Sequence, residues 1–275
     1  MPVNAFLDGI PGEAPEAQRG GLASARRRRG FFRKSAPPFS AKPEQVSTER
    51  RRIMSQHAPC PSLDGCSVVA CGTLRREIRR LADTGFLSGD RLFFTAPGLH
   101  EWPKQLEKQL IRQAHKARAG SPEVVVAYGE KCYLDFDAGV ETDALLAGLG
   151  TEFVRVRAKN CVDMLADAET RARVAGDANV YWLTPGWLEH WDFIFRDWDA
   201  AMANETFPAH DKAIVLDAVG YFDGLLETAP ERLLEIGDWM KLEIEPYPAS
   251  LDRLKQLLCE SARRSEDDPA GGSAR

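Results

Sequence analysis

Short apolar runs recur along the chain between about residues 64 and 262, and each is followed by a stretch whose apolar positions have helical spacing. Several runs, such as Val124–Ala127, are continuously apolar, which is typical of parallel strands that are covered on both faces. The stretches that follow, such as PKQLEKQLIRQAHKA, predict the connecting helices. The seven expected strands are residues 67–70, 92–95, 124–127, 153–156, 180–183, 213–216 and 242–244.

This alternation predicts one α/β domain from residue 64 to 262, with a doubly wound, mostly parallel sheet of about seven strands. An eight-stranded barrel is a less favoured alternative, because only seven units are visible. The final unit, KLEIEPYPASLDRLKQLL, has alternating polar positions and predicts an edge strand.

Both ends of the chain differ from this pattern. Residues 1–53 combine arginine runs and prolines without any apolar period, so we expect a disordered segment. Alternative interpretations are a nucleic-acid-binding arm, a transit peptide, or sequence upstream of a true start at Met54. Residues 263–275 are also expected to be a disordered tail.

The charge is distributed unevenly. The net charge is −5, and residues 1–53 carry 11 basic and 5 acidic side chains, so the remainder carries −5 − 6 = −11. An acidic body argues against nucleic acid as a partner. No apolar run approaches the roughly 20 residues that span a bilayer, so we expect no membrane association and a cytoplasmic protein.

In a parallel sheet, ligands bind beyond the carboxyl ends of the strands, so the exit loops are the places to look for chemistry. These loops read CGTLRRE, APGLHEWP, YGEKC, RAKNC, TPGW and DAVGYFD. Four soft-metal ligands occupy four consecutive exits: Cys71, His100, Cys132 and Cys161. The sequence therefore places them along one rim of the expected sheet.

Thiolate sulfur and imidazole nitrogen are the ligands that zinc prefers, and ligands from separate loops can leave one coordination position open. The exit-loop residues therefore predict a zinc site. Two alternatives remain: a thiolate nucleophile with His100 as its base, or buried cysteines that act only as small apolar residues. No CxxC pair supports a zinc-finger interpretation.

Other exit residues are candidates for binding a cofactor or metabolite, because glycines allow close approach and polar or aromatic groups flank them. These candidates are Gly72, Tyr128, Gly129, Thr184, Gly186 and Trp187. The segment TPGWLEHWDFIFRDW predicts one helix with Thr184 as its N-cap and an aromatic stripe that is chiefly core. Glu77 is either a hydrogen-bond acceptor near the rim or a surface ion-pair residue among arginines.

The blocks CGTLRRE, LHEWP, YGEKC, the cysteine followed by VDML, and YWLTPGW resemble the signature blocks of the prokaryotic domain-of-unknown-function family number 1638. The resemblance extends from about Cys66 to Pro246. Family members commonly have one residue between YG and the cysteine, whereas this chain has Glu130 and Lys131.

Family members are often encoded beside corrinoid-dependent methyltransferases, so the resemblance implies a role in one-carbon metabolism. The expected function is a metal-dependent, zinc-binding protein of one-carbon or methyl-transfer metabolism that acts on a small molecule. The alternative is a non-catalytic accessory protein that binds a metal, a corrinoid or a metabolite. In both cases a corrinoid protein or a methyltransferase is the expected partner.

Overall fold

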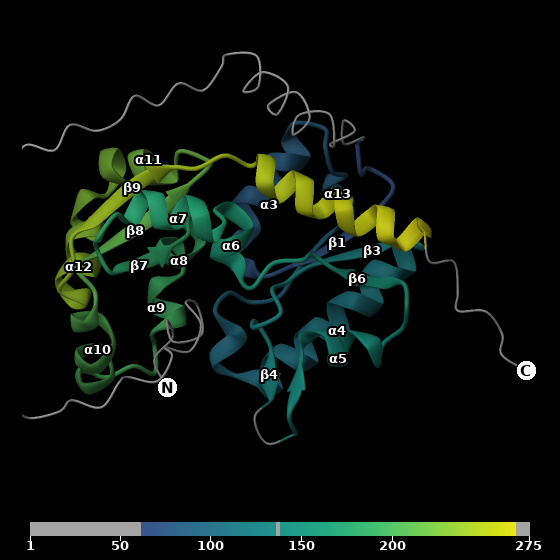
Figure 1. Ribbon diagram of the computed structural model, residues 1–275, viewed down its shortest axis with the longest axis horizontal. Helices are drawn as coiled ribbons and strands as arrows, with labels where there is room; N and C mark the ends of the chain where they lie inside the picture. The colour runs from purple at the N-terminus through teal and green to yellow at the C-terminus, as the bar shows by residue number, and fades with distance from the viewer. Residues whose placement is uncertain (1–61, 136–137, 268–275) are drawn as a thin grey trace, which may run out of the picture. The chain divides into compact units, whose positions relative to one another are not determined.

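The computed structural model describes residues 62–135 and 138–267. The predictions for residues 1–53, for a start at Met54 and for the tail beyond residue 267 fall outside this part of the chain. Within it, helices alternate with mostly parallel strands, which confirms the α/β class (Figure 1).

The strands form two parallel sheets. The first sheet has the order β2-β1-β3-β6, and the second has the order β7-β8-β9. The bounds of these strands are β1 Ser67–Ala70, β2 Leu92–Phe94, β3 Val124–Ala127, β6 Phe153–Arg155, β7 Val180–Leu183, β8 Lys212–Asp217 and β9 Ile244–Pro248. A small antiparallel ribbon pairs β4 Leu134–Asp135 with β5 Val140–Glu141.

Six of the expected strands are present where predicted, and the seventh, β9, begins only at Ile244, the last residue of the range 242–244. The seven strands do not share one sheet as the sequence predicts. Within the described ranges the first sheet ends at β6, and β7 begins a new sheet that has no pairing to the first. The physical reason is that an apolar run indicates a buried strand but does not indicate which strands lie beside it. The neighbours of a strand depend on tertiary packing. The position of β9 at an edge confirms the prediction, and its prolines suit an edge.

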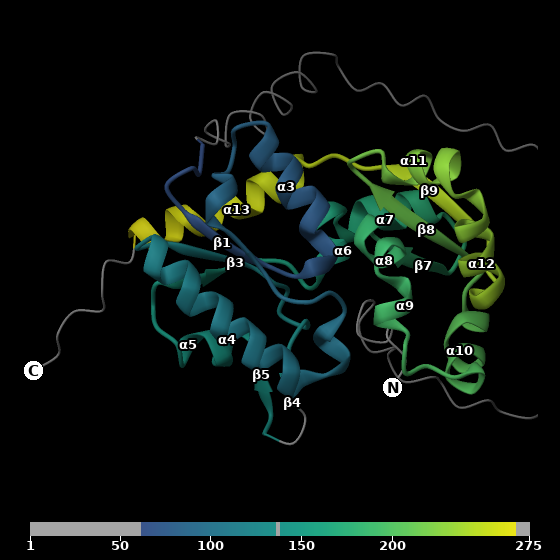
Figure 2. The same ribbon diagram turned by 180° about the vertical axis from the view of Figure 1, so that it is seen from behind.

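Both faces of the first sheet are covered, as Figures 1 and 2 show. The side chains of Val69, Val124 and Val126 pack in one cluster with α4 (Pro103–Gly120). The alternate residues, including Val68 and Val125, pack in another cluster with α13 (Asp252–Asp267). This arrangement explains why the strands are apolar without alternation.

One buried cluster joins the two sheets. Val68 of β1, Val125 of β3 and Trp182 of β7 belong to it, together with Leu258 of α13. The other face of the second sheet, which includes Tyr181, packs in a separate aromatic-rich cluster. The two sheets therefore share one core although no strand pairing connects them.

The remaining helices connect these strands. Their bounds are α3 Arg75–Asp83, α5 Thr142–Ala147, α6 Cys161–Leu165, α7 Ala168–Ala175, α8 Pro185–Glu189, α9 Trp191–Ile194, α10 Ala200–Thr206, α11 Tyr221–Thr228 and α12 Pro230–Met240. None of the helices in the described ranges is both long and apolar enough to cross a bilayer.

Two helices differ from the sequence-based expectation. The aromatic segment is not one helix, because it breaks at His190 between α8 and α9, although Trp187, Trp191 and Phe195 are buried as predicted. Helix α13 continues to Asp267, past the boundary predicted at residue 262. Residues 252–267 contain no proline or glycine, so nothing in this stretch breaks the helix.

Candidate functional site

The four predicted metal ligands follow the four strands of the first sheet. Cys71 comes directly after β1, and His100 lies in the 3₁₀ turn Leu99–Glu101 after β2. Cys132 follows β3, and Cys161 begins α6 after β6. All four strands are parallel, so their exits lie at one edge of the sheet, as the sequence predicts.

Three of these residues are free thiols that lie close enough for their charges to act on one another: Cys71, Cys132 and Cys161. Burial raises the pKa of the Cys132 thiol, and the negative charges of Cys161 and Cys71 thiolates would raise it further. Burial, followed by the charge of Cys71, raises the pKa of Cys161 to about 12. At neutral pH these two groups are therefore protonated thiols.

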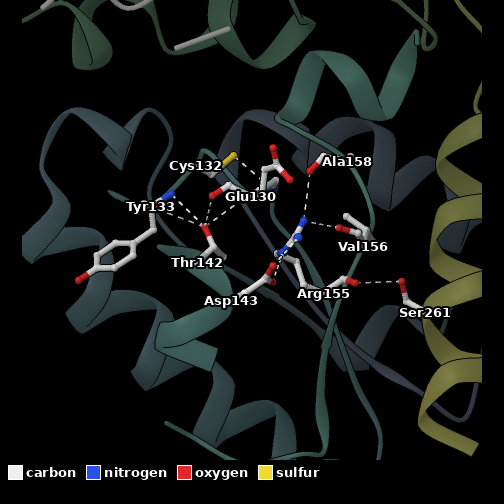
Figure 3. A network of polar contacts seen from close by, with 10 residues as sticks. Glu130, Cys132, Tyr133, Thr142, Asp143, Arg155, Val156, Ala158 and Ser261 are labelled. Carbon is white, nitrogen blue, oxygen red and sulfur yellow. Dashed lines mark hydrogen bonds and ion pairs between the residues drawn. The ribbon is translucent and has the colours of Figure 1, made fainter. Parts of the chain in front are cut away.

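A hydrogen-bond network fixes the loop that carries Cys132, as Figure 3 shows. The Gly129 backbone N–H donates to Cys132 Sγ at 3.2 Å. The buried Thr142 hydroxyl lies 3.0 Å from the Gly129 carbonyl and 3.1 Å from the Glu130 carbonyl, and it accepts from the Tyr133 N–H. A short threonine side chain thus closes the loop onto the start of α5.

The exit loops after β3 and β6 are joined to each other. The backbone N–H groups of Glu130 and Lys131 donate to the carbonyls of Ala158 and Lys159 at 3.0 and 3.1 Å. Gly129 packs so closely here that a Cβ atom would lie 2.2 Å from the Lys159 carbonyl oxygen. Residues Cys132 and Cys161 are brought together by these loops.

Arg155 supports the same pair of loops at the end of β6. Its guanidinium forms an ion pair with Asp143 of α5, and it donates to the Val156 and Ala158 carbonyls at 2.6 and 3.1 Å (Figure 3). Ser261 of α13 donates to the Arg155 carbonyl at 3.4 Å. The loop after β6 is therefore held from α5 and from α13.

The exit of the second sheet meets the same rim. Thr184 is the N-cap residue of α8, as predicted, but its hydroxyl donates to the Thr73 carbonyl at 3.2 Å instead of to an N–H of α8. A Cβ atom on Gly186 would lie 2.2 Å from that same carbonyl oxygen, and one on Gly72 would lie 2.7 Å from Pro97 N.

Protein backbone therefore makes the close approaches at Gly72, Gly129 and Gly186. This explains why glycine stands at these positions without any ligand. The role of these glycines in cofactor binding stays a prediction.

Polar groups surround the thiols. The Thr73 hydroxyl donates to Cys71 Sγ at 3.2 Å, and the Tyr128 hydroxyl forms a short hydrogen bond with the Thr95 hydroxyl. Tyr128 is buried, which raises the pKa of its phenol, and nearby Cys71 adds to the rise. The phenol is therefore neutral and remains a hydrogen-bond donor.

Several buried polar atoms at this rim have no hydrogen-bond partner of normal geometry among the described residues. They are His100 Nε2, Trp187 Nε1 and Tyr181 Oη. The centres of the His100 and Trp187 rings lie 5.6 Å apart. Burial raises the pKa of the Tyr181 phenol, and the charges of Glu101 and Cys161 raise it further. Buried polar groups are almost always paired in proteins, so this concentration of unpaired ones among the described residues is unusual and makes the rim a candidate ligand site.

Burial lowers the pKa of His100 to about 4, so its imidazole is neutral at pH 7. Glu101 Oε1 lies 3.5 Å from His100 Nε2, too far for a normal hydrogen bond. The weak basicity of His100 and the protonated thiols of Cys132 and Cys161 do not favour a thiolate–imidazolium pair. The hypothesis of a cysteine nucleophile activated by His100 therefore receives little support from this geometry.

Glu77 is not the surface ion-pair residue that its arginine neighbours suggested. Its side chain is fully buried, and neither carboxyl oxygen has a hydrogen-bond partner among the described residues. Burial raises the pKa of Glu77 to about 8, with nearby Asp217 adding to the rise. The group is therefore a neutral carboxylic acid at pH 7.

Metal-binding geometry is not assembled in this arrangement. Within residues 62–135 and 138–267, no group of three or more His, Cys, Asp or Glu side chains is positioned to hold a metal ion. The donor atoms have the chemistry of a zinc site, but their present side-chain positions do not form a ligand set.

The sequence missed several residues that complete the rim. Thr73 and Thr95 stand beside recognised exit residues, and their position next to Cys71 and Ala96 was the available signal. Tyr181 lies inside an apolar strand, where a tyrosine is ordinarily core, so no sequence pattern distinguished it. Its unpaired hydroxyl is visible only in the fold.

These features define an α/β protein with a thiol-rich rim where the exits of two parallel sheets meet. The family described as "Protein of unknown function (DUF1638)" matches residues 94–258, more than half of the chain, and the protein belongs to that family. His100, Cys132 and Cys161 lie inside the matched region, whereas Cys71 precedes it. Comparison with curated proteins found no match, and comparison with solved structures found none.

Proposed function

We propose that the protein is a metal-binding protein whose thiol-rich rim holds zinc. The observation that supports this proposal most directly is that three free thiols and a buried imidazole nitrogen, which has no hydrogen-bond partner among the described residues, follow the four strands of one parallel sheet. The donors are Cys71, Cys132, Cys161 and His100. Thiolate and imidazole are ligands that zinc prefers. Ligands that come from four separate loops can form a zinc site that keeps one coordination position open for a substrate or water.

The chain's own residues have defined tasks at such a site. The Thr73 hydroxyl and the Gly129 N–H donate hydrogen bonds to Cys71 and Cys132 sulfur, which would orient the two side chains as ligands. Trp187 is buried against His100 and excludes water from that side. When bound, zinc would act as a Lewis acid for a coordinated thiol or water.

The wider role follows from the family resemblance and not from the geometry. We propose that the protein is cytoplasmic and acts in one-carbon or methyl-transfer metabolism on a small molecule. Its proposed partner is a corrinoid protein or a methyltransferase. Tyr128, Thr184, Gly186 and Trp187 are the proposed contacts for that molecule, with Gly72 and Gly129 beside them.

Zinc content tests the proposed metal site directly. Protein purified without chelators, or reconstituted with zinc and then desalted, should carry about one zinc per chain by elemental mass spectrometry. Cys161→Ser and His100→Ala should each lower affinity by orders of magnitude, because each removes one ligand. Affinity should also fall as pH decreases, since protons compete for the thiolates.

Cys66→Ser is the matched control. Cys66 is a buried cysteine that directly precedes β1, at the opposite end of the strand from the rim, and its thiol donates to Glu123 at 3.1 Å. This variant should keep its zinc. A wild-type protein that retains no zinc after reconstitution, or a Cys66→Ser variant that loses zinc as readily as Cys161→Ser, contradicts the proposal.

Turnover separates an enzyme from an accessory protein. A zinc-loaded enzyme should transfer a methyl group from a methyl donor to a thiol or corrinoid acceptor, and Cys161→Ser should abolish that transfer. Saturable binding of the same compounds without product formation would instead support the accessory role.

A further inference from the structure

A groove separate from the thiol-rich rim lies between α3, β2 and α4. It has a volume of about 610 Å³. Phe93 and Phe94 of the edge strand β2 line it from opposite faces of the first sheet, Phe93 on the side of α4 and Phe94 on the side of α3. Three basic side chains also line it: Arg75, Arg79 and Lys116. Small-molecule sites typically have volumes of about 300 to 1,000 Å³, so the groove has a suitable size for a metabolite.

The positive charge in this groove is not balanced. Arg75, Arg79 and Lys116 form no ion pair within 4 Å with any carboxylate of residues 62–135 and 138–267, although the more distant charge of Glu189 acts on Arg75. Asp83 is the acidic side chain in the lining. The body of the protein is acidic, so three unpaired cations around one groove are not a consequence of overall composition.

Of the three basic side chains, Arg75 has the surroundings that oppose its positive charge most strongly. Its guanidinium lies 4.4 Å from the centre of the Phe94 ring and is partly buried. Burial lowers the pKa of Arg75, and the like charge of Arg79 lowers it further. An anion placed between the two arginines would relieve both effects.

Arg76, the next residue of α3, differs from Arg75 because its guanidinium has a carboxylate partner. Arg76 forms a bidentate pair with Glu189 at 2.8 and 3.0 Å, and it also lies over the Tyr221 ring. That pairing faces away from the groove, since Arg76 does not line it. Helix α3 therefore satisfies one arginine internally and leaves Arg75 and Arg79 for a partner from outside.

We propose that this groove binds a small organic oxyanion. Arg75 and Arg79 hold its phosphate or carboxylate group, Lys116 adds positive charge from α4, and Phe93 at the edge of the sheet contacts its apolar or aromatic part. Arginine suits this task because its planar fork matches two oxygen atoms of such a group. The site is independent of the thiol-rich rim and requires no metal.

Titration of the full chain with simple probes tests this site. Phenyl phosphate, benzoate, inorganic phosphate and the neutral analogue benzyl alcohol are titrated by isothermal calorimetry at low and high salt. Phenyl phosphate or benzoate should bind saturably and more weakly at high salt, and inorganic phosphate should bind more weakly than phenyl phosphate. The tighter of the two aromatic anions identifies the preferred oxyanion. Benzyl alcohol should not bind saturably.

The variants connect binding to the groove. Arg75→Gln and Arg79→Gln should each weaken binding by roughly tenfold or more, because each removes a charged hydrogen-bond donor. Lys116→Gln is an exposed replacement that cannot disturb packing, and it should also weaken binding. Arg80→Gln is the matched control, since Arg80 is an exposed arginine of the same helix that does not line this groove.

Failure of every anion to bind saturably to the folded wild-type protein would overturn the proposal. An equal loss in Arg80→Gln would also overturn it, because general surface charge would then explain the binding. Binding of a single-stranded oligonucleotide with none of the small anions would show a polyanion surface in place of a metabolite site.

Discussion

Glu77 is a carboxyl group whose surroundings oppose its charge. Its side chain is fully buried with both oxygens unpaired, and its pKa is raised to about 8 from a usual value of 4.5. Between these two values the unfolded chain has released the proton and the folded chain has kept it. Stability is therefore full below pH 4.5 and decreases as pH rises toward 8.

Replacing Glu77 by glutamine should remove this loss. Between pH 5 and 8 the wild-type free energy of unfolding should fall by about 3 kcal/mol more than that of Glu77→Gln. Urea unfolding at several pH values measures both. Glu227→Gln, which changes an exposed carboxylate on α11, should follow the wild type. Parallel curves for wild type and Glu77→Gln would contradict the assignment of a neutral buried acid.

The burial of Glu77 could be predicted from the sequence in part. Leu74, Ile78 and Leu81 have helical spacing and are buried, and position 77 lies on the same face as Leu74 and Leu81. The surrounding arginines suggested a surface position and obscured this spacing. Its lack of a partner could not be predicted, because that depends on where Asp217 and Glu189 are placed by other elements.

At the scale of elements, the exit loops pack backbone against backbone. Gly129→Ala would place a Cβ atom 2.2 Å from the Lys159 carbonyl oxygen and 2.4 Å from the Asn160 nitrogen. Backbone atoms cannot rotate away as a side chain can, so the loops must separate. We expect a loss of roughly 2–4 kcal/mol in the free energy of unfolding, measured by urea denaturation.

Gly224→Ala provides the comparison. Gly224 lies within α11, and a Cβ atom there would have no atom within 4 Å. Alanine is a better helix former, so this variant should gain about 0.5–1 kcal/mol. If Gly129→Ala is as stable as the wild type, the close approach between the two loops is wrong.

The elements differ in how far the sequence determines them. The continuous apolar runs located the strands, and the exit positions of Cys71, His100, Cys132 and Cys161 followed from them. Gly72, Gly129 and Gly186 were predicted to be sites of close approach, but the sequence does not distinguish a ligand from the protein backbone that approaches them in the structure. The break between α8 and α9 was missed, because the aromatic spacing continues through it without proline or glycine.

At the scale of the whole molecule, the two sheets share one buried cluster. Val68 and Val125 of the first sheet and Trp182 and Ile214 of the second belong to it. If one sheet unfolded, the apolar side chains of the other sheet that pack against it would be exposed to water. The sequence could not predict this division into two sheets, because strand order depends on contacts between distant segments.

The shared core predicts one cooperative unfolding transition. Hydrogen exchange should give the slowest amides of β1, β3, β7 and β8 the same opening free energy within about 1 kcal/mol. Leu258→Ala, in α13, should lower all of these values together by roughly 2–5 kcal/mol. Opening of β7 and β8 at a much lower free energy than β1 and β3 would show that the sheets unfold separately.

The position of α13 has a consequence for how the chain folds during synthesis. The strands β1 and β3 are made early, but the helix that covers one of their faces is made after all nine strands. Helices α3 and α6 cover part of that apolar face, but the part that packs against Leu254 and Leu258 stays exposed until α13 has left the ribosome. The nascent protein therefore presents an aggregation-prone surface for most of its synthesis, and it is a natural client for chaperones that bind exposed apolar segments near the ribosome.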